Sequence, residues 1–323
     1  MFKLRTGYLI SGIATGLVLL FSFVWTLPDG KLRVVFCDVG QGDAAYIRFP
    51  DGRDMLVDGG PNDRVLGCLG KHMPFWDRAI DIVAMTHPQK DHMQGLISVF
   101  DRYAVDYFVR SDVANDTEGY KELVEVVKRK KISQKFVTTG ERITVGPVTL
   151  AMIWPSEEQI AKGKSSIRSH LATLQGETLQ SPQSVLGSSV VGELNDYSLV
   201  FTLHYGTFDV LFTGDADNHV NYQFVGKQAL DGVEVLKVPH HGSKTGMTAA
   251  FLDWIFGPPR SRAGLVPVVP ESQLAVISVG KNSYGHPAEE TLKALRDRAI
   301  KILRTDEKGD IEVVSDGKGW TVQ

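Results

Sequence analysis

Four apolar segments of this sequence end in acidic or histidine residues, and this repetition constrains the fold more than any other feature. The segment 82–92 reads IVAMTHPQKDH, and the segments 55–60 (MLVDGG), 210–215 (VLFTGD) and 235–243 (VLKVPHHGS) share its design. Short apolar runs of this kind are typical of buried strands, and loops at strand ends often carry functional residues. The pattern therefore predicts that acidic and imidazole groups from four distant segments converge.

The order of extended and helical patterns favours a two-sheet sandwich. Three β-type runs at 33–38, 44–49 and 55–58, separated by Gly/Asp turns, predict a meander. Farther along, extended and helical patterns alternate in two rounds. One of the helical patterns predicts an amphipathic helix at 117–131. Because no linker divides these rounds, we expect residues 30–323 to form one mixed α+β (α/β) domain, with two packed sheets faced by helices.

Residues from about 156 to 193 interrupt this pattern. They are polar, rich in Ser, Gln and Gly, and weakly patterned. Long segments without regular structure are uncommon inside a compact domain and are often functional. We therefore expect an inserted loop that lies over the site.

The N-terminal residues 1–29 predict a membrane anchor. Residues 8–27 carry no charge and, as a helix, would cross about 30 Å of hydrocarbon. Lys3 and Arg5 precede this stretch, so the positive-inside rule places the N-terminus in the cytoplasm. A cleavable signal peptide is the alternative, although no small-x-small cleavage site follows. We expect one uncleaved transmembrane helix in a bacterial-type cell membrane, with the remaining chain outside the cytoplasm.

Charge and cysteine usage set two further limits. The net charge of -3 gives no general attraction to nucleic acid. Cys37 and Cys68 lack the spacing of metal ligands, and Cys37 lies in an apolar strand pattern as a small hydrophobic residue would. A disulfide between them stays open as the alternative.

The residues that follow the strand at 82–86 have the chemistry of metal ligands. His87 and Gln89 are two positions apart in an extended turn and can point the same way, whereas Asp91 and His92 begin a helix and can serve a second ion. Asp215 can emerge at the same edge and bridge two ions. Imidazole and carboxylate groups suit zinc, and also manganese or iron.

Six motifs in this order resemble the metallo-β-lactamase-like domain of the ComEC-type DNA-internalisation (competence) proteins. The motifs are DVGQGD (38–43), VDGG (57–60), HPQKDH (87–92), NDYSLV (195–200), TGD (213–215) and PHHGS (239–243). The likeness continues at 284–287 and 304–306 and covers roughly residues 31 to 323. It implies a four-layer αββα sandwich that binds one or two metal ions, with zinc expected first.

The resemblance also implies the ligands. One metal position would lie at His87 and Gln89 and a second at Asp91 and His92, with Asp215 between them. One histidine of the pair at 240–241 would close the second position.

The sequence leaves open which histidine of this pair binds metal. Alignment on the following glycine slightly favours His241, which leaves His240 to orient a ligand or contact substrate. Two positions depart from the family's pattern. Gln89 offers a neutral amide where the common HxHxDH motif has histidine, and the usual third-motif histidine is missing, with Asn195 or Asp196 near that place as candidate metal or substrate contacts. We therefore expect the first metal position to be the weaker one.

The remaining candidates concern catalysis and substrate binding. Asp91 or Asp58 would orient a metal-activated hydroxide or the ligands. His286, next to Gly and Pro, would protonate a leaving group, with an ordinary loop histidine as the alternative. Ser243 and Lys244 follow the paired histidines and would hold a phosphate.

These features favour a membrane-anchored, metal-dependent hydrolase, specifically a phosphodiesterase or nuclease. Its substrate would be nucleic acid or an envelope phosphodiester, and a separate membrane channel would be a partner, because only one apolar segment of spanning length is present here. A hydrolase of a small ester or lactone is the second possibility, since one fold hosts many substrates. The third is a catalytically reduced binding module.

Overall fold

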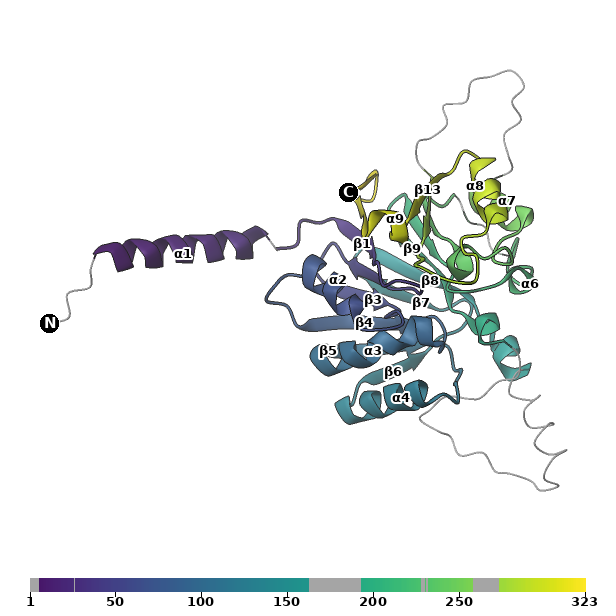
Figure 1. The fold of residues 1–323 in the computed structure, drawn as a ribbon, viewed down its shortest axis with the longest axis horizontal. Helices are drawn as coiled ribbons and strands as arrows, with labels where there is room; N and C mark the ends of the chain where they lie inside the picture. The colour runs from purple at the N-terminus through teal and green to yellow at the C-terminus, as the bar shows by residue number, and fades with distance from the viewer. Residues whose placement is uncertain (1–5, 26, 163–192, 228–229, 231, 258–272) are drawn as a thin grey trace, which may run out of the picture.

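The fold is seen in a computed structural model that describes residues 6–25, 27–162, 193–227, 230, 232–257 and 273–323. Two mixed sheets pack face to face (Figure 1). The first sheet has the order β15-β14-β1-β2-β3-β4-β5-β6. Its strands are β1 (Leu32–Phe36), β2 (Ala45–Arg48), β3 (Asp54–Val57), β4 (Ala79–Met85), β5 (Ala104–Arg110), β6 (Ser133–Phe136), β14 (Ile311–Ser315) and β15 (Trp320–Val322).

The second sheet has the order β13-β12-β11-β10-β9-β8-β7. Its strands are β7 (Arg142–Val145), β8 (Val148–Trp154), β9 (Val200–Tyr205), β10 (Phe208–Phe212), β11 (Val235–Lys237), β12 (Leu274–Ile277) and β13 (Lys301–Arg304). Strand β3 runs parallel to β4, and β10, β11 and β12 run parallel to one another. The carboxyl ends of parallel neighbours meet at one sheet edge, which is where the predicted ligand residues stand.

Helices cover the outer face of each sheet. Against the first sheet pack α2 (Arg64–His72), α3 (Lys90–Arg102) and α4 (Glu118–Lys130), and against the second pack α6 (Asn218–Asn221), α7 (Ala249–Phe256) and α8 (Glu289–Arg296). The short α9 (Thr305–Lys308) follows β13. This arrangement confirms the mixed α/β fold and is consistent with the predicted αββα sandwich.

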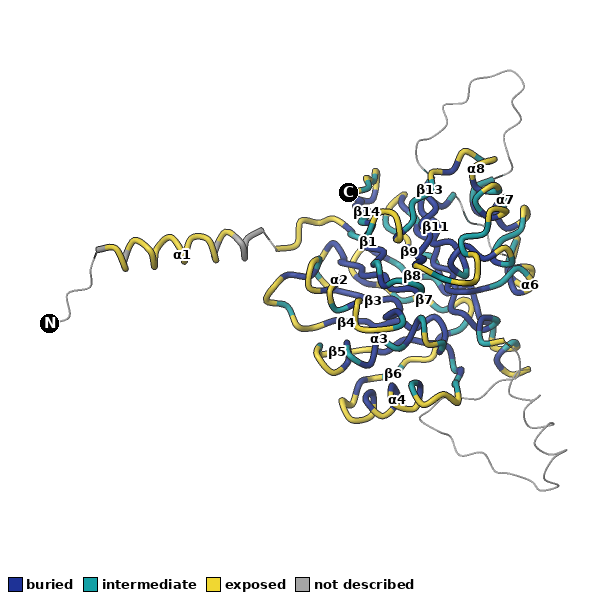
Figure 2. Tube along the Cα trace, viewed as in Figure 1, coloured by how far each residue is buried: buried dark blue, intermediate teal, exposed yellow. Residues whose placement is uncertain are grey.

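Apolar side chains from both sheets form the central core. Phe36 and Phe201 contact Phe212 from the two sheets, with ring centroids 6.0 and 4.9 Å away. Figure 2 shows the resulting dark blue, buried interior between the layers. The alternation of apolar residues along each strand places one set in this core and the other against the helices. The core therefore fixes the two sheet edges relative to each other.

The N-terminal segment is helical, as α1 (Thr6–Trp25), and projects away from the sandwich (Figure 1). Within the described part of the chain, however, no helix meets the length and apolarity needed to cross a membrane. The single transmembrane helix predicted at residues 8–27 is therefore not supported.

Other predictions about the chain have mixed outcomes. The meander is confirmed, because β1, β2 and β3 pair antiparallel in succession. The insertion predicted at about 156–193 lies mostly outside the described residues. The sequence patterns did not indicate α2, whose two glycines lower its helix propensity, or the short edge strands β6 and β7.

Cys37 and Cys68 form a disulfide bond, the alternative that the sequence left open. Cys37 follows β1 and Cys68 lies in α2, so the bond links the first sheet to the helix that covers it. Residues 38–43 continue directly from Cys37 toward the strand ends described next. The disulfide therefore anchors the start of a loop that reaches the candidate site.

Candidate metal centre

The ends of strands from both sheets bring the predicted ligand residues together. In the first sheet, Asp58 follows β3 and His87 follows the parallel β4, after which α3 begins with Lys90. In the second sheet, Asp215 follows β10, and the paired histidines follow β11 in the 3-10 turn Pro239–Gly242. Because the sheets face each other, these four ends meet across the sandwich.

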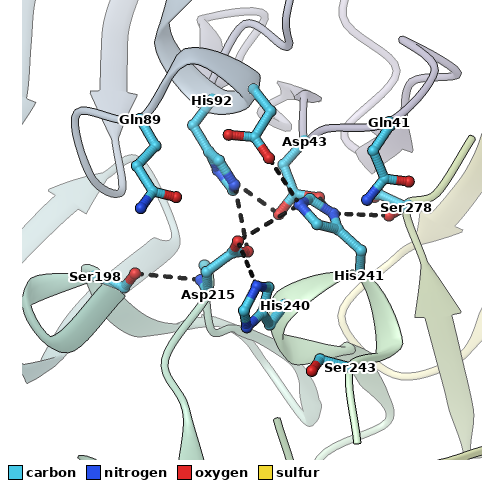
Figure 3. A network of polar contacts seen from close by, with 12 residues as sticks. Gln41, Asp43, Gln89, His92, Ser198, Asp215, His240, His241, Ser243 and Ser278 are labelled. Atoms are coloured by element: carbon cyan, nitrogen blue, oxygen red, sulfur yellow. Dashed lines mark hydrogen bonds and ion pairs between the residues drawn. The ribbon is translucent and has the colours of Figure 1, made fainter. Parts of the chain in front are cut away.

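Four side chains form a compact cluster, which we call the tetrad: Asp91, His92, Asp215 and His241. Each offers one ligand atom, and these atoms all lie within 4.8 Å of one another. His92 Nε2 is 3.3 Å from Asp215 Oδ1, and His241 Nε2 is 3.3 Å from Asp91 Oδ2 and 3.4 Å from Asp215 Oδ2. Figure 3 shows His92, from α3, and His241, from the turn after β11, both directed at Asp215.

The donor chemistry of the tetrad fits a divalent metal ion. Two imidazole nitrogens and two carboxylate oxygens are common ligands of zinc and of other first-row metals. His92 Nε2 and Asp215 Oδ1 are buried, and apart from their mutual 3.3 Å contact they have no partner among the described residues. Buried polar atoms are costly without a partner, and a bound cation would satisfy both. The tetrad can therefore hold one metal ion.

Asp58 lies behind the tetrad and orients His92. Its carboxylate accepts hydrogen bonds from Thr86 N and Thr86 Oγ1, each at 2.7 Å, and lies 2.9 Å from His92 Nδ1. Asp58 is 1% exposed and has a left-handed φ of 59°, a strained conformation that surrounding contacts must hold. Such a carboxylate fixes the tautomer of a metal-binding histidine and leaves Nε2 for the ion. Of the two roles predicted for Asp58, orienting the hydroxide and orienting a ligand, the geometry favours the second.

The structure separates the two adjacent histidines. Both have left-handed backbone conformations, with φ of 48° at His240 and 53° at His241, so their side chains diverge. His241 is buried, its Nδ1 donates to Ser278 O at 3.0 Å, and its Nε2 faces the tetrad. His240 is a quarter exposed at its side chain, and its Nε2 lies 3.9 Å from Asp215 Oδ2. His241 therefore belongs to the tetrad, whereas His240 lies at its rim.

Two groups support His240 at this rim. Asp217 Oδ1 lies 3.0 Å from His240 Nδ1 and accepts a 2.8 Å hydrogen bond from Thr245 Oγ1. The His286 ring is 5.5 Å from the His240 ring, edge to face. The structure thus brings the predicted His286 near the metal centre, beside a histidine that a carboxylate orients.

The first predicted metal position is arranged differently. His87 is fully buried beside His92, with ring centroids 4.1 Å apart. Its Nε2 lies 3.1 Å from Gln89 Oε1, a hydrogen-bond distance between these two residues. In the structure these two polar atoms satisfy each other, and the weaker first metal position stays a prediction from the sequence.

The other predicted site residues lie around the tetrad without joining it. The Asp196 carboxylate pairs with His219, and Asn195 is buried in the 3-10 turn Leu194–Tyr197. Ser243 Oγ lies 3.0 Å from Thr245 Oγ1, and Lys244 is exposed. Among the described residues, these four side chains form no hydrogen bond or ion pair with the tetrad, so their metal or substrate roles stay predictions.

Sequence reasoning missed three residues of the site: Asp43, Lys237 and Asp217. Asp43 Oδ1 lies 3.2 Å from His241 Nδ1, and its Oδ2 forms an ion pair with Lys237. Both side chains are less than a tenth exposed. Asp43 closes a motif that carries the family resemblance, which was a usable signal. Lys237 is the one charged residue in the run 235–238 (VLKV), and a charge among apolar strand residues indicates a buried partner.

Charges within the site shift the pKa values of its members. Burial alone would raise the pKa of Asp215, but the neighbouring His241 and His92 lower it well below its usual range. Burial opposes the charged form of His241, yet Asp215 and Asp43 raise its pKa to about 10. The pKa of His87 shifts in the opposite direction, because burial and the nearby His92 lower it to about 3. The metal-free tetrad therefore holds protons that a cation must replace.

We expect metal binding to release protons at neutral pH and apparent affinity to rise with pH. His241 has a pKa of about 10 against the usual 6.5, so it is protonated in the metal-free protein at pH 7 and must lose this proton to bind metal. Titration calorimetry in buffers of different ionisation enthalpy measures the released protons. Affinity independent of pH between 6 and about 9 would contradict this arrangement.

The same shift predicts how the metal-free protein responds to pH. A pKa raised in the folded state stabilises the fold fully below about 6.5, and this stabilisation is lost as the pH rises through about 10. Metal-bound protein should lack this loss, since the ion replaces the proton. Unfolding temperatures measured with and without chelator across this range test the difference.

The two packed sheets faced by helices, with the tetrad at their strand ends, are consistent with the metallo-β-lactamase-like sandwich that the sequence motifs imply. No protein-family model matches the chain. Over 92% of its length it is 24% identical to ComE operon protein 3 of Bacillus subtilis, and over 36% it is 34% identical to competence protein ComA of Neisseria gonorrhoeae. Over most of its length the chain is thus similar in sequence to ComEC-type competence proteins, in agreement with the six motifs that it shares with them.

This likeness has a limited extent. The matched region spans only 34% of ComE operon protein 3 and 15% of competence protein ComA. Among solved structures, the metallo-β-lactamase fold protein YhfI from Bacillus subtilis is similar, with a TM-score of 0.49 and 12% identity over 87% of this chain and 99% of that one. Because the chain matches only a part of the two competence proteins, the activities of those proteins enter only the proposals made below.

Proposed function

We propose that this protein is a metal-dependent phosphodiesterase. The observation that carries the proposal is the tetrad of Asp91, His92, Asp215 and His241, whose ligand atoms lie within 4.8 Å of one another at the rim of the sandwich. Zinc is the first candidate, with manganese or iron as alternatives. A divalent ion bound there would supply Lewis-acid polarisation of a phosphoryl oxygen and a water of lowered pKa.

The chain's own residues divide the remaining work. The Asp91 side chain is one-third exposed and so is the tetrad member most open to solvent, where it can orient the attacking water. His240, fixed by Asp217, can donate a hydrogen bond to a phosphoryl oxygen. His286 lies beyond His240. Burial and the neighbouring His240 lower the pKa of its ring, and a bound anionic phosphodiester would oppose this shift and favour the protonated form that can donate a proton to the leaving oxygen. Attack and departure would thus be assisted by different groups.

Substrate assays on the full chain test the proposal. We expect purified protein to contain metal and to hydrolyse bis-p-nitrophenyl phosphate and single-stranded DNA, with activity lost on chelation and restored by metal. Hydrolysis of carboxylic esters or lactones alone would replace the phosphodiesterase with the small-ester hydrolase. A metal-free protein without hydrolytic activity would indicate the reduced binding module.

His286 should matter most for poor leaving groups. A positioned general acid contributes roughly 10² to 10⁴ in rate when the leaving oxygen needs a proton. We expect His286→Gln to reduce kcat about 10²-fold or more on an alkyl phosphodiester and only slightly on a p-nitrophenyl ester, because p-nitrophenolate leaves without protonation. Equal losses on both substrates would contradict this role.

The location of the domain outside the cytoplasm is also proposed. Lys3 and Arg5 at the N-terminus motivated it, and the Cys37–Cys68 disulfide adds independent support, because disulfides persist in oxidising compartments and are rare in the cytosol. Attachment to a membrane through residues 8–27 and association with a separate channel stay predictions from the sequence. Thiol accessibility of Cys37 and Cys68 in intact cells, with and without a reductant, tests the location.

A further inference from the structure

Lys237 places a buried positive charge beneath the metal centre. It is the last residue of β11, and its side chain is 4% exposed. Its ammonium group forms an ion pair with Asp43 Oδ2. Burying an ammonium group without a partner is strongly unfavourable. The Asp43 carboxylate compensates the buried charge of Lys237.

Asp43 contacts the tetrad from behind at two points. Its Oδ1 lies 3.2 Å from His241 Nδ1, and its backbone N donates a 3.1 Å hydrogen bond to Asp91 O. The preceding Gly42 permits this approach, because a Cβ there would lie 2.3 Å from Asp91 O. The loop 38–43 is therefore seated directly on the segment that carries Asp91.

We propose that Asp43 is a positioning residue for the metal centre and that Lys237 is the fixed cation that holds its carboxylate against His241. The Asp43 carboxylate and Ser278 O both face His241 Nδ1, so the opposite nitrogen is directed at Asp91 and Asp215. Partners of this kind set the orientation of a histidine ligand and its affinity for metal. The inference rests on the metal-binding part of the proposed function.

A purely structural ion pair would behave differently. The fold contains one for comparison, between Arg48 and Asp54 in the first sheet, with side chains 10% and 2% exposed and a 3.1 Å contact. Asp54 belongs to β3 and is not among the tetrad or its contacts. The substitution Asp54→Asn therefore serves as a matched control, because it breaks a buried ion pair without touching the metal centre.

The experiment uses the full chain as wild type, Asp43→Asn, Lys237→Met, the double variant of these two, and Asp54→Asn. Metal-free samples are titrated with Zn²⁺ against a competing chelator, and Co²⁺ samples are compared by their visible absorption. Unfolding temperatures of the metal-free samples report the structural cost separately.

We expect Asp43→Asn to weaken Zn²⁺ binding by about 10- to 100-fold and to change the Co²⁺ spectrum. The double variant should regain part of the unfolding temperature lost in each single variant, because it leaves no buried charge unpaired, yet it should bind Zn²⁺ as weakly as Asp43→Asn. Asp54→Asn should lower the unfolding temperature and leave Zn²⁺ affinity and the Co²⁺ spectrum unchanged.

Wild-type Zn²⁺ affinity and an unchanged Co²⁺ spectrum in Asp43→Asn or in the double variant would overturn the inference and leave the proposed function standing. Failure of the wild type itself to bind Zn²⁺ or Co²⁺ would overturn both.

Discussion

Asp215→Asn should abolish tight metal binding and lower phosphodiester hydrolysis by roughly 10³-fold or more, equivalent to about 4 kcal/mol of transition-state stabilisation. Asp215 lies between the two histidines of the tetrad, with oxygens 3.3 and 3.4 Å from their Nε2 atoms. An amide keeps the shape of the side chain but removes the negative charge and leaves a poorer ligand. Elemental analysis of the purified variant and its kcat/KM on bis-p-nitrophenyl phosphate measure the two effects.

The control for this variant lies near the start of β10, the strand that Asp215 follows. Asp209→Asn changes a carboxylate of β10 that contacts His204 rather than the tetrad, and we expect it to retain metal and activity. If Asp215→Asn kept the metal content of the wild type, the tetrad would not be the metal site. Loss of metal in both variants would instead indicate a general effect on the strand.

Removing the Cys37–Cys68 disulfide should lower the free energy of unfolding by about 3 to 4 kcal/mol. The bond joins residues 31 positions apart, and a cross-link of this span restricts the unfolded chain substantially. It also holds the start of the loop 38–43, which carries Asp43. Chemical unfolding of the double variant Cys37→Ala and Cys68→Ala, compared with the wild type, measures the loss.

Reduction provides the independent check on this prediction. The wild type treated with dithiothreitol should lose a similar amount of stability, whereas the double variant should not respond to the reductant. A double variant as stable as the wild type would show that the bond contributes little. Metal content of the variant should be measured at the same time, because displacement of the loop 38–43 would also weaken the tetrad.

The sequence predicted the central fold because its signals are local. Apolar runs such as 55–57 and 82–85 form strands wherever they are buried, and polar residues at their ends must leave the sheet. Once parallel pairing of these two strands is assumed, their ends meet at one edge, so Asp58 and His87 could be grouped from the sequence, whereas Asp215 joins them through the packing of the second sheet. Elements with weak local signals, such as α2 with its two glycines, were missed for the same reason.

The tertiary structure decided how the candidate metal centre is built. His240 and His241 are neighbours with the same chemistry, and only Ser278 O and Asp43, from elements distant in the sequence, direct His241 into the tetrad. The Cys37–Cys68 bond and the Lys237–Asp43 ion pair likewise join residues that no spacing rule relates.

The sequence by itself thus determined which groups stand at the strand ends, since strand formation and the positions of ligand-type side chains are properties of short segments. It did not determine which of those groups share a metal ion. That depends on side-chain directions and on buried partners brought together by the packing of two sheets, and only the folded chain fixes these distances.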